Sequence, residues 1–319
     1  MTKKICAYID LLGFRKHVDK DSEGALRMLN CYQQIIINKI SEKSFCTAPA
    51  AEAYSINNIT ENSLVDSFEN FIPFSDGIFI TGSDSDKFIS QISYFLLESF
   101  EPHSSYFANP KNKEDPTIYV VSKNIKDAGG KIKPLESEHI VFPVLFRGGI
   151  AYDEVVDIKS NYIFKNEKQL MNSITGMGIV KAVGLEEMKY KGPRVFCHQE
   201  VVGRLGEEVK KWLISPIEER NEIFELLWPV IHYPQNEEPD YEIQEFDGLF
   251  YPALNLWCAY NHEEFGIHYY KLMKLIIKST LHYFKLRNYE NESINHVTKI
   301  LIKEGLEIKI KDLIDSKYV

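Results

Sequence analysis

The sequence has few of the features that mark membrane, zinc-binding or nucleic-acid-binding proteins. No run of about 18 uncharged apolar residues occurs, so we expect no transmembrane helix. The five cysteines form no C-x-x-C pair and the nine histidines form no H-x-x-x-H pair, which disfavours a structural zinc site and is typical of reduced thiols. The net charge of −9 argues against general binding to nucleic acid or anionic membrane, because such binding needs a basic surface.

The N-terminal segment resembles a signal peptide only superficially. Two lysines precede an apolar stretch, but Asp10 interrupts that stretch and no small-residue cleavage site follows. We therefore expect a cytoplasmic protein. The chain of 319 residues has 44% hydrophobic and 26% charged residues, which is typical of a packed globular enzyme or binding protein.

The apolar periodicity and the turn signals predict alternating strands and helices over the first 200 residues. The run AYIDLLGF (7–14) reads as a buried strand, and Asp21 or Ser22 can cap a helix that follows. The stretch 70–82 reads as a hairpin with Asp76 at its turn. Further along we expect a helix from Asp84 or Ser85, a short strand at 118–121, a strand and turn over 141–156, a helix over 178–188 and a strand over 192–201.

This order of elements predicts an α+β fold with a ferredoxin-like antiparallel sheet and helices on one face. The polar, aperiodic stretch near 41–67 and the stretch near 101–139, which is punctuated by Pro, Asn, Lys and Gly-Gly, read as insertions, and we expect a third insertion near 203–240. Beyond residue 201 the pattern predicts helices over 207–213 and 216–227, a hairpin over 241–257, a long amphipathic helix over 265–283 and a last helix over 294–303.

Two aspartates, Asp10 and Asp76, are candidates for a functional site. In a ferredoxin-like sheet the first strand and the hairpin are central neighbours, so both carboxylates can converge at one edge. Two such carboxylates repel each other and are costly to ionise when buried unless a cation lies between them, which indicates Mg²⁺ or Mn²⁺. Turn chemistry is the alternative, because Asp-Gly at a hairpin and an aspartate after a strand also occur for local reasons.

Four segments, taken together, resemble the class III adenylate and guanylate cyclase family. YIDLLGF resembles the first metal motif of that family, and FSDGIFI resembles its second metal hairpin, with Ser75 in place of the usual glycine. FRGGIAYDEVV resembles its Arg-x-Gly-Ile strand and Gly-Glu-Val-Val turn, with Asp153 in place of glycine. GMGIVKAVGLEE (176–187) has the spacing of the family's catalytic helix.

The resemblance implies roles for individual residues and two bound Mg²⁺ or Mn²⁺ ions. The implied metal ligands are Asp10, Leu11 and Asp76; the implied substrate-binding residues are Leu12, Gly13, Phe14, Arg147 and Ser173; the implied catalytic residues are Arg147 and Lys181. The planar guanidinium of arginine suits phosphate oxygens. The resemblance also implies a homodimer with the active site at its interface, so that the helix after Gly176 would face the metal site of the partner subunit.

The sequence departs from the purine-specific members of this family at four positions. Ile72 and Ser173 stand where purine cyclases read the base, and neither side chain can reproduce the purine contacts. Val180 and Gly184 stand where the family usually has a ribose-positioning asparagine and a transition-state arginine. Lys181, Lys189 and Lys191 are nearby candidates for the missing positive charge, and a solvated face is the alternative reading of these lysines.

Loss of the purine determinants, with both metal aspartates kept, resembles the bacterial pyrimidine cyclases of antiphage defence, the Pycsar type. The resemblance therefore implies a catalytic domain over 1–258 that cyclises UTP, or less readily CTP, and a helical C-terminal extension over 259–319. Such an enzyme would work with a cyclic-nucleotide-gated effector. A catalytically silent nucleotide-binding or dimerisation protein is the alternative. A polymerase-like or diguanylate-cyclase-like protein is disfavoured, because the sequence has no Gly-Gly-Asp/Glu-Glu-Phe turn.

Overall fold

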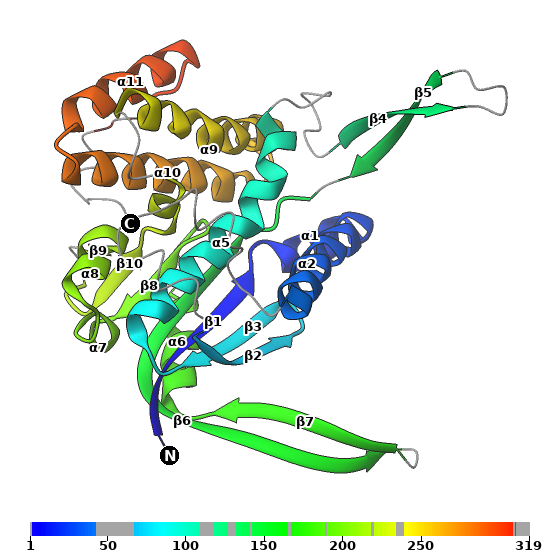
Figure 1. The fold of residues 1–319 in the computed structure, drawn as a ribbon, viewed down its shortest axis with the longest axis vertical. Helices are drawn as coiled ribbons and strands as arrows, with labels where there is room; N and C mark the ends of the chain where they lie inside the picture. Colours follow the sequence, from blue (N-terminus) through cyan, green and yellow to red (C-terminus); the bar gives the residue numbers. More distant parts are fainter. Residues whose placement is uncertain are drawn as a thin grey trace.

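The fold is α+β, as the sequence predicts, with a mostly antiparallel sheet and helices packed against it (Figure 1). The computed structural model describes residues 2–42, 67–108, 118–126, 132–140, 142–164, 167–188, 190–217, 220–233, 239–308 and 310. Among these residues, no helix combines the length and the apolar character needed to cross a membrane.

The main sheet has eight strands in the described part of the chain. Their order is β2-β3-β1-β6-β8-β10-β9, and β7 pairs with β6 outside this path. Strand β1 is antiparallel to both β3 and β6, whereas β6 and β8 are parallel. The bounds are β1 Thr2–Leu11, β2 Phe68–Phe74, β3 Gly77–Gly82, β6 Phe146–Phe164, β7 Glu167–Thr175, β8 Val195–His198, β9 Ile214–Pro216 and β10 Ile223–Leu226. A separate hairpin pairs β4 (Ile118–Lys126) with β5 (Ile132–Ile140).

Alternation along β1 divides its side chains between the two faces of the sheet. Ile5 and Ile9 are fully buried in the main core, together with apolar residues of α2 (Ser22–Glu42) and α5 (Ser85–Ala108). Cys6 points to the other face, into a smaller cluster with Ala182 of α6 (Met177–Glu186). Helices therefore cover both faces. The predicted single helical face is wrong, because β1 is apolar on both sides and needs cover on both.

The starts of the first two long helices agree with the sequence prediction. The carboxylate of Asp21 accepts a hydrogen bond of 2.9 Å from the amide of Gly24 at the beginning of α2. Asp84 accepts one of 3.1 Å from the amide of Lys87 in the same way at the beginning of α5. Each aspartate satisfies an amide that the first helical turn leaves without a partner. Helix α1 (Phe14–Lys20), which precedes α2, was not predicted.

Strand β6 is longer than the sequence predicts. The expected turn after Asp153 does not occur, and β6 continues to Phe164 before the chain returns as β7. Asp153 lacks the conformational freedom of the glycine that such a turn would use, and the β-branched pair Val155 and Val156 favours an extended chain. Helix α5 also runs further than expected, to Ala108, into the predicted insertion at 101–139. Most of the predicted insertion at 41–67 lies outside the described residues.

Two segments after residue 213 form a different type of element from the one that the sequence predicts. The segment 216–227, predicted as a helix, contains β10, which pairs with both β8 and β9, so pairing with distant strands decides its conformation. The segment 241–257, predicted as a hairpin, lies within helix α9 (Pro239–Tyr260). Asp247-Gly248 imitates a turn there, but buried Phe246, Phe250 and Ala253 recur at helical spacing.

The remaining helices after residue 198 complete the fold. They are α7 Gln199–Val202, α8 Glu207–Leu213, the 3₁₀ helix η1 Trp228–His232, α10 Gly266–Leu286 and α11 Glu290–Lys303. The predictions of helices at 207–213, 265–283 and 294–303 are confirmed. Leu272 and Ile276 of α10 belong to the same buried cluster as β1 and α5. The predicted boundary between residues 258 and 259 falls inside α9, which continues to Tyr260.

Candidate metal and phosphate site

The structure brings Asp10 and Asp76 to one edge of the sheet. Asp10 lies opposite Gly77 in the pairing of β1 with β3, and Asp76 is in the turn between β2 and β3. The amide of Leu11 donates a hydrogen bond of 2.9 Å to the carbonyl of Asp76, which fixes the turn against the end of β1. Packing favours glycine at position 77, because a Cβ there would lie 2.7 Å from the ring of Tyr8.

The carboxylate of Asp10 is held in a poorly solvated position. Only 14% of its side chain is exposed. Burial raises its pKa above the ordinary value, and the charge of Asp76 raises it further, although Arg147 acts in the opposite direction. The nearby hydroxyl of Tyr8 also has a raised pKa, chiefly through burial and then through the charge of Asp10. A cation bound between the two aspartates would remove much of this electrostatic cost.

Arg147 lies between two carboxylates. It is opposite Asp10 in the pairing of β1 with β6, and its Nε and Nη2 donate to Oδ2 of Asp10 at 3.3 and 3.2 Å. Its Nε also lies 2.5 Å from Oε1 of Glu186, at the end of α6. That Nε–H is directed at Asp10, so the buried Oε1 of Glu186 accepts no well-directed hydrogen bond from the described residues despite the short distance. Chiefly because it is buried, Glu186 has a raised pKa.

Glu186 was missed as a site residue in the sequence, although it lies inside the segment that resembles the catalytic helix. Gly178, Ala182 and Leu185 are the buried residues of α6, so they define the side of the helix that faces the sheet. Glu186 follows Ala182 by one helical turn and therefore falls on this same side. An acidic residue on an otherwise apolar helix face is the signal that could have identified it.

The turn after β1 only partly matches its predicted role. Gly13 has a φ of +84°, a conformation that favours glycine, and Phe14 begins α1. The amide of Leu12 donates to the carbonyl of Leu145 at 2.8 Å. The prediction that Leu12 contacts phosphate through its main chain is therefore wrong for the amide group, because that amide already donates to the carbonyl of Leu145.

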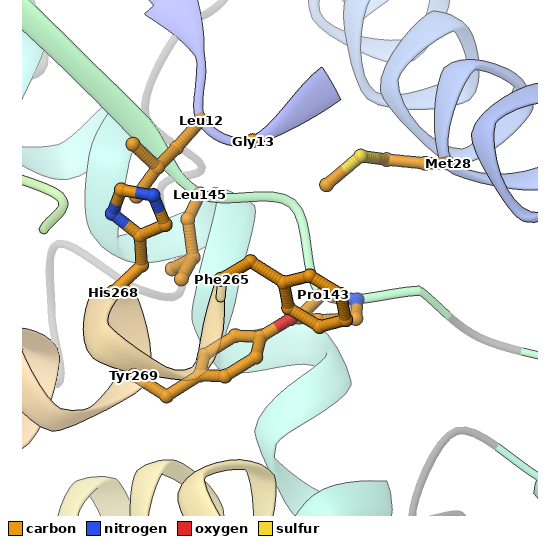
Figure 2. Close-up of a pocket in the computed structure, with 8 residues that line it drawn as sticks. All are labelled: Leu12, Gly13, Met28, Pro143, Leu145, Phe265, His268 and Tyr269. Carbon is orange, nitrogen blue, oxygen red and sulfur yellow. The ribbon is translucent and has the colours of Figure 1, made fainter. Parts of the chain in front are cut away.

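A small, mainly apolar pocket lies beside this turn (Figure 2). Its lining comes from the turn itself, from α2, from the segment that leads into β6 and from the beginning of α10: Leu12, Gly13, Met28, Pro143, Leu145, Phe265, His268 and Tyr269. The pocket contains no carboxylate and no lysine or arginine, so its lining suits an apolar group and not a phosphate or a metal ion.

Two predicted residues lie far from the carboxylates within the chain. Ser173 pairs with Ile158 in the β6–β7 hairpin, on the order of 30 Å along β6 from Arg147. Lys181 forms ion pairs with Asp153 at 2.7 Å and with a second acid on α7, so its charge is already engaged. Neither residue reaches Asp10 within the chain.

Val180 and Gly184 lie on the solvent side of α6. The side chain of Val180 is 60% exposed, and a Cβ added at Gly184 would meet no atom within 4 Å. This face of α6 is therefore available to a large group from outside the chain. The side chains at these two positions offer no hydrogen bond.

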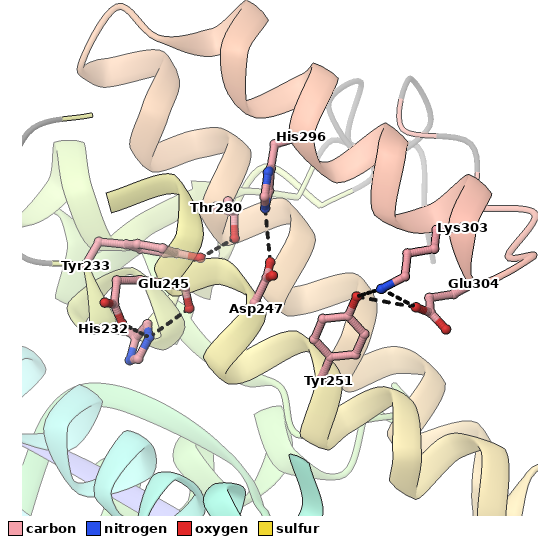
Figure 3. A network of polar contacts seen from close by, with 9 residues as sticks. All are labelled: His232, Tyr233, Glu245, Asp247, Tyr251, Thr280, His296, Lys303 and Glu304. Carbon is pink, nitrogen blue, oxygen red and sulfur yellow. Dashed lines mark hydrogen bonds and ion pairs between the residues drawn. The ribbon is translucent and has the colours of Figure 1, made fainter. Parts of the chain in front are cut away.

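A second group of polar contacts joins the C-terminal helices (Figure 3). His296 of α11 lies 3.0 Å from Asp247 of α9, and the hydroxyls of Tyr233 and Thr280 lie 2.5 Å apart. The first contact joins α11 to α9, and the second joins Tyr233, which follows η1, to α10. Their role is to hold the helices in place.

The Asp10 and Asp76 pair fits a hard divalent cation better than it fits a zinc ion. Among the described residues, no three His, Cys, Asp or Glu side chains are grouped closely enough to hold a metal ion. Mg²⁺ commonly uses only one or two protein carboxylates and takes its other ligands from water or substrate phosphate, so two aspartates are sufficient. Comparison with protein-family models and with curated proteins found no match.

Proposed function

We propose that this chain is a metal-dependent nucleotide cyclase that converts a pyrimidine nucleoside triphosphate, UTP in preference to CTP, into its 3′,5′-cyclic monophosphate and pyrophosphate. The observation that carries the proposal is the meeting of Asp10, Asp76 and Arg147 at one edge of the sheet. In this reaction the ribose 3′-hydroxyl attacks the α-phosphorus, the bond to the bridging oxygen breaks, and pyrophosphate leaves.

The strand order supports the proposal. The part of the sheet formed by β2-β3-β1-β6 is antiparallel, with α1 and α2 between β1 and β2, and α5 between β3 and β6. This order is compatible with the ferredoxin-like plan that the resemblance to class III cyclases implies. It makes β1 and β3 neighbours, and so brings the two aspartates together.

Each charged residue of the site has a role in the proposed reaction. Asp10, Asp76 and the main chain of Leu11 would hold two Mg²⁺ or Mn²⁺ ions. When bound, such ions lower the pKa of a hydroxyl and neutralise charge on the leaving group. Arg147 binds the triphosphate through its planar guanidinium, and Glu186 orients that guanidinium from the α6 side.

The exposed face of α6 favours a homodimer with the site at its interface. Met177 and Val180 are large apolar residues with more than half of their side chains exposed, and Ile158 of β6 is 40% exposed. The β6–β7 hairpin projects from the body of the chain (Figure 1). Across such an interface Ser173 and Lys181 would contribute from the partner subunit. The cytoplasmic location and the gated effector of antiphage defence belong to the same proposal.

A catalytically silent nucleotide-binding protein is the second candidate. The observation that favours it is the outer face of α6, where Val180 and Gly184 provide neither the amide nor the guanidinium that the cyclase family places there. Lys181 cannot replace them without leaving its ion pair with Asp153. Such a protein would bind nucleotide and metal without turnover.

Incubation with each nucleoside triphosphate and Mn²⁺, followed by mass spectrometry of the products, tests the proposal. We expect cyclic UMP and pyrophosphate from the wild type. Asp76→Asn should remove the activity, because a neutral amide does not replace an anionic metal ligand. Glu154→Gln changes an exposed carboxylate at the other end of the sheet and should leave the activity unchanged. A folded dimer that yields no cyclic product from any nucleotide contradicts the proposal, and nucleotide binding without turnover identifies the second candidate.

A further inference from the structure

Helix α10 has an unbalanced charge. Its 21 residues include four lysines and no aspartate or glutamate, although the chain as a whole has a net charge of −9. Lys271, Lys274 and Lys278 recur at intervals of three and four, which places them on one side of the helix. No residue of the proposed cyclase site comes from this helix, so its positive charge has no assigned role.

Strand β8 brings a further cation to the edge of the sheet that holds the aspartates. Arg194 immediately precedes β8, and its carbonyl accepts a hydrogen bond of 3.1 Å from the amide of Gly148 on β6. Arg194 is therefore the neighbour of Arg147 across the sheet. Since adjacent strands are about 4.8 Å apart, the main chains of Arg194 and Asp10 are separated by two strand spacings, or about 10 Å.

The side chain of Arg194 lies on the α6 face of the sheet. Its guanidinium carbon is 5.0 Å from the ring centre of Tyr190 and 4.9 Å from that of Phe196. Phe196 packs in a cluster with Leu185 of α6. Glu186 follows Leu185 directly and contacts Arg147, so both arginines are on the same face and at the same edge.

One buried acid is shared between two of these cations. The carboxylate of Glu225, on β10, forms an ion pair with Arg194 and another of 2.8 Å with Lys278. Burial disfavours its charge, but Lys278 and Arg194 hold its pKa at about 2. This pairing fixes α10 against the strands and leaves the group with more positive than negative charge.

Lys271 adds a positive charge that Glu225 does not balance. It is half-buried, and its stem packs against Gly192, where an added Cβ would lie 2.5 Å from the Cβ of Lys271. Burial, followed by the charges of Lys274 and Arg194, lowers the pKa of Lys271 despite the opposing effect of Glu225. A half-buried position with an excess of positive charge favours the binding of an anion.

We propose that Arg194, Lys271 and Lys278 form an anion site for the terminal phosphates of the nucleoside triphosphate, and hence for the pyrophosphate that leaves. This inference rests on the proposed function and adds the C-terminal helix α10 to the site. The main chains of Arg147 and Arg194 are neighbours on adjacent strands, so a polyphosphate bound at Asp10 would extend from one arginine towards the next. The lysines then neutralise charge at the far end of the chain of phosphates.

Calorimetric titration of the full chain with pyrophosphate, without metal or nucleotide, tests the site. Lys271→Gln should weaken binding at least about tenfold, because it removes one charge-assisted contact. Lys271→Arg keeps the charge and should retain binding. Lys285→Gln, at an exposed position on the same helix, should bind like the wild type. Lys271→Gln should also unfold at the wild-type temperature or above, because it relieves repulsion; a purely structural lysine would lower that temperature.

The outcomes separate this inference from the proposed function. Equal pyrophosphate affinities for Lys271→Gln and Lys285→Gln overturn the anion site. Pyrophosphate binding that depends on Lys271, in a protein that converts no nucleotide, supports the anion site and counts against the cyclase. Turnover that pyrophosphate inhibits equally in the wild type and in Lys271→Gln overturns the anion site and leaves the cyclase in place.

Discussion

Replacing Arg147 with methionine tests whether one positive charge stabilises the site. The guanidinium lies 3.2 Å from Oδ2 of Asp10 and 2.5 Å from Oε1 of Glu186. Methionine retains part of the apolar stem and removes the charge. The variant therefore leaves two largely buried carboxylates without their cation, and the pKa of both should rise further.

The expected loss follows from these two contacts. A hydrogen bond to a charged group contributes about 1.5–3 kcal/mol. Because 35% of the Arg147 side chain is exposed, solvent screens both contacts, and we expect a total loss of about 2 kcal/mol in the free energy of unfolding at pH 8. A carboxylate with a raised pKa contributes stability that is present at low pH and is lost as the pH rises through the raised pKa. Arg147→Met should therefore lose less stability at pH 5 than at pH 8.

Urea unfolding at pH 5 and pH 8 measures this difference. Arg147→Lys is the matched control, because it keeps the charge and should retain more than half of the lost stability. An equal loss at both pH values would refute the reasoning, since it would assign the effect to packing instead of charge. So would a lysine variant as unstable as the methionine variant.

Four further substitutions, the last two compared as a pair, test other parts of the structure by urea unfolding. Asp10→Asn should raise the free energy of unfolding at pH 8, because it removes a charge that burial disfavours. The gain should vanish below about pH 4, where the carboxyl group is protonated, and the absence of a gain at pH 8 would contradict the raised pKa of Asp10. Glu225→Gln should cost about 3–5 kcal/mol in the free energy of unfolding at pH 7, because it leaves two cations without their buried partner. Because the pKa of Glu225 is depressed, this cost should shrink as the pH falls from the ordinary pKa of a glutamate towards 2, and a cost that does not depend on pH would argue against the ion pairs. Gly149→Ala should lower the free energy of unfolding by about 1–3 kcal/mol, since its Cβ would lie 2.2 Å from the carbonyl oxygen of Ala182. Gly184→Ala, on an open helix face, should raise it by about 0.5–1 kcal/mol, and equal effects of the two variants would mean that α6 does not pack on β6 in this way.

Local sequence signals are sufficient to predict the two aspartates of the proposed site. The apolar strand that contains Asp10 and the Asp-Gly turn at Asp76 are each recognisable within about ten residues, because alternation and turn chemistry are properties of short segments. The same holds for the caps of α2 and α5 and for the periodic helix α10. The α+β class follows from the order of these elements.

Tertiary structure determines which side chains lie around the two aspartates. Glu186 and Arg194 reach the site only because α6 packs on β1 and β6, and because β8 pairs in parallel with β6. The conformation of 216–227 and the extension of β6 likewise depend on strands that are distant in the chain. A short segment does not contain the information on which distant strand it will pair with. This is the physical reason that the sequence indicates the two aspartates and Arg147 but not Glu186 and Arg194 beside them.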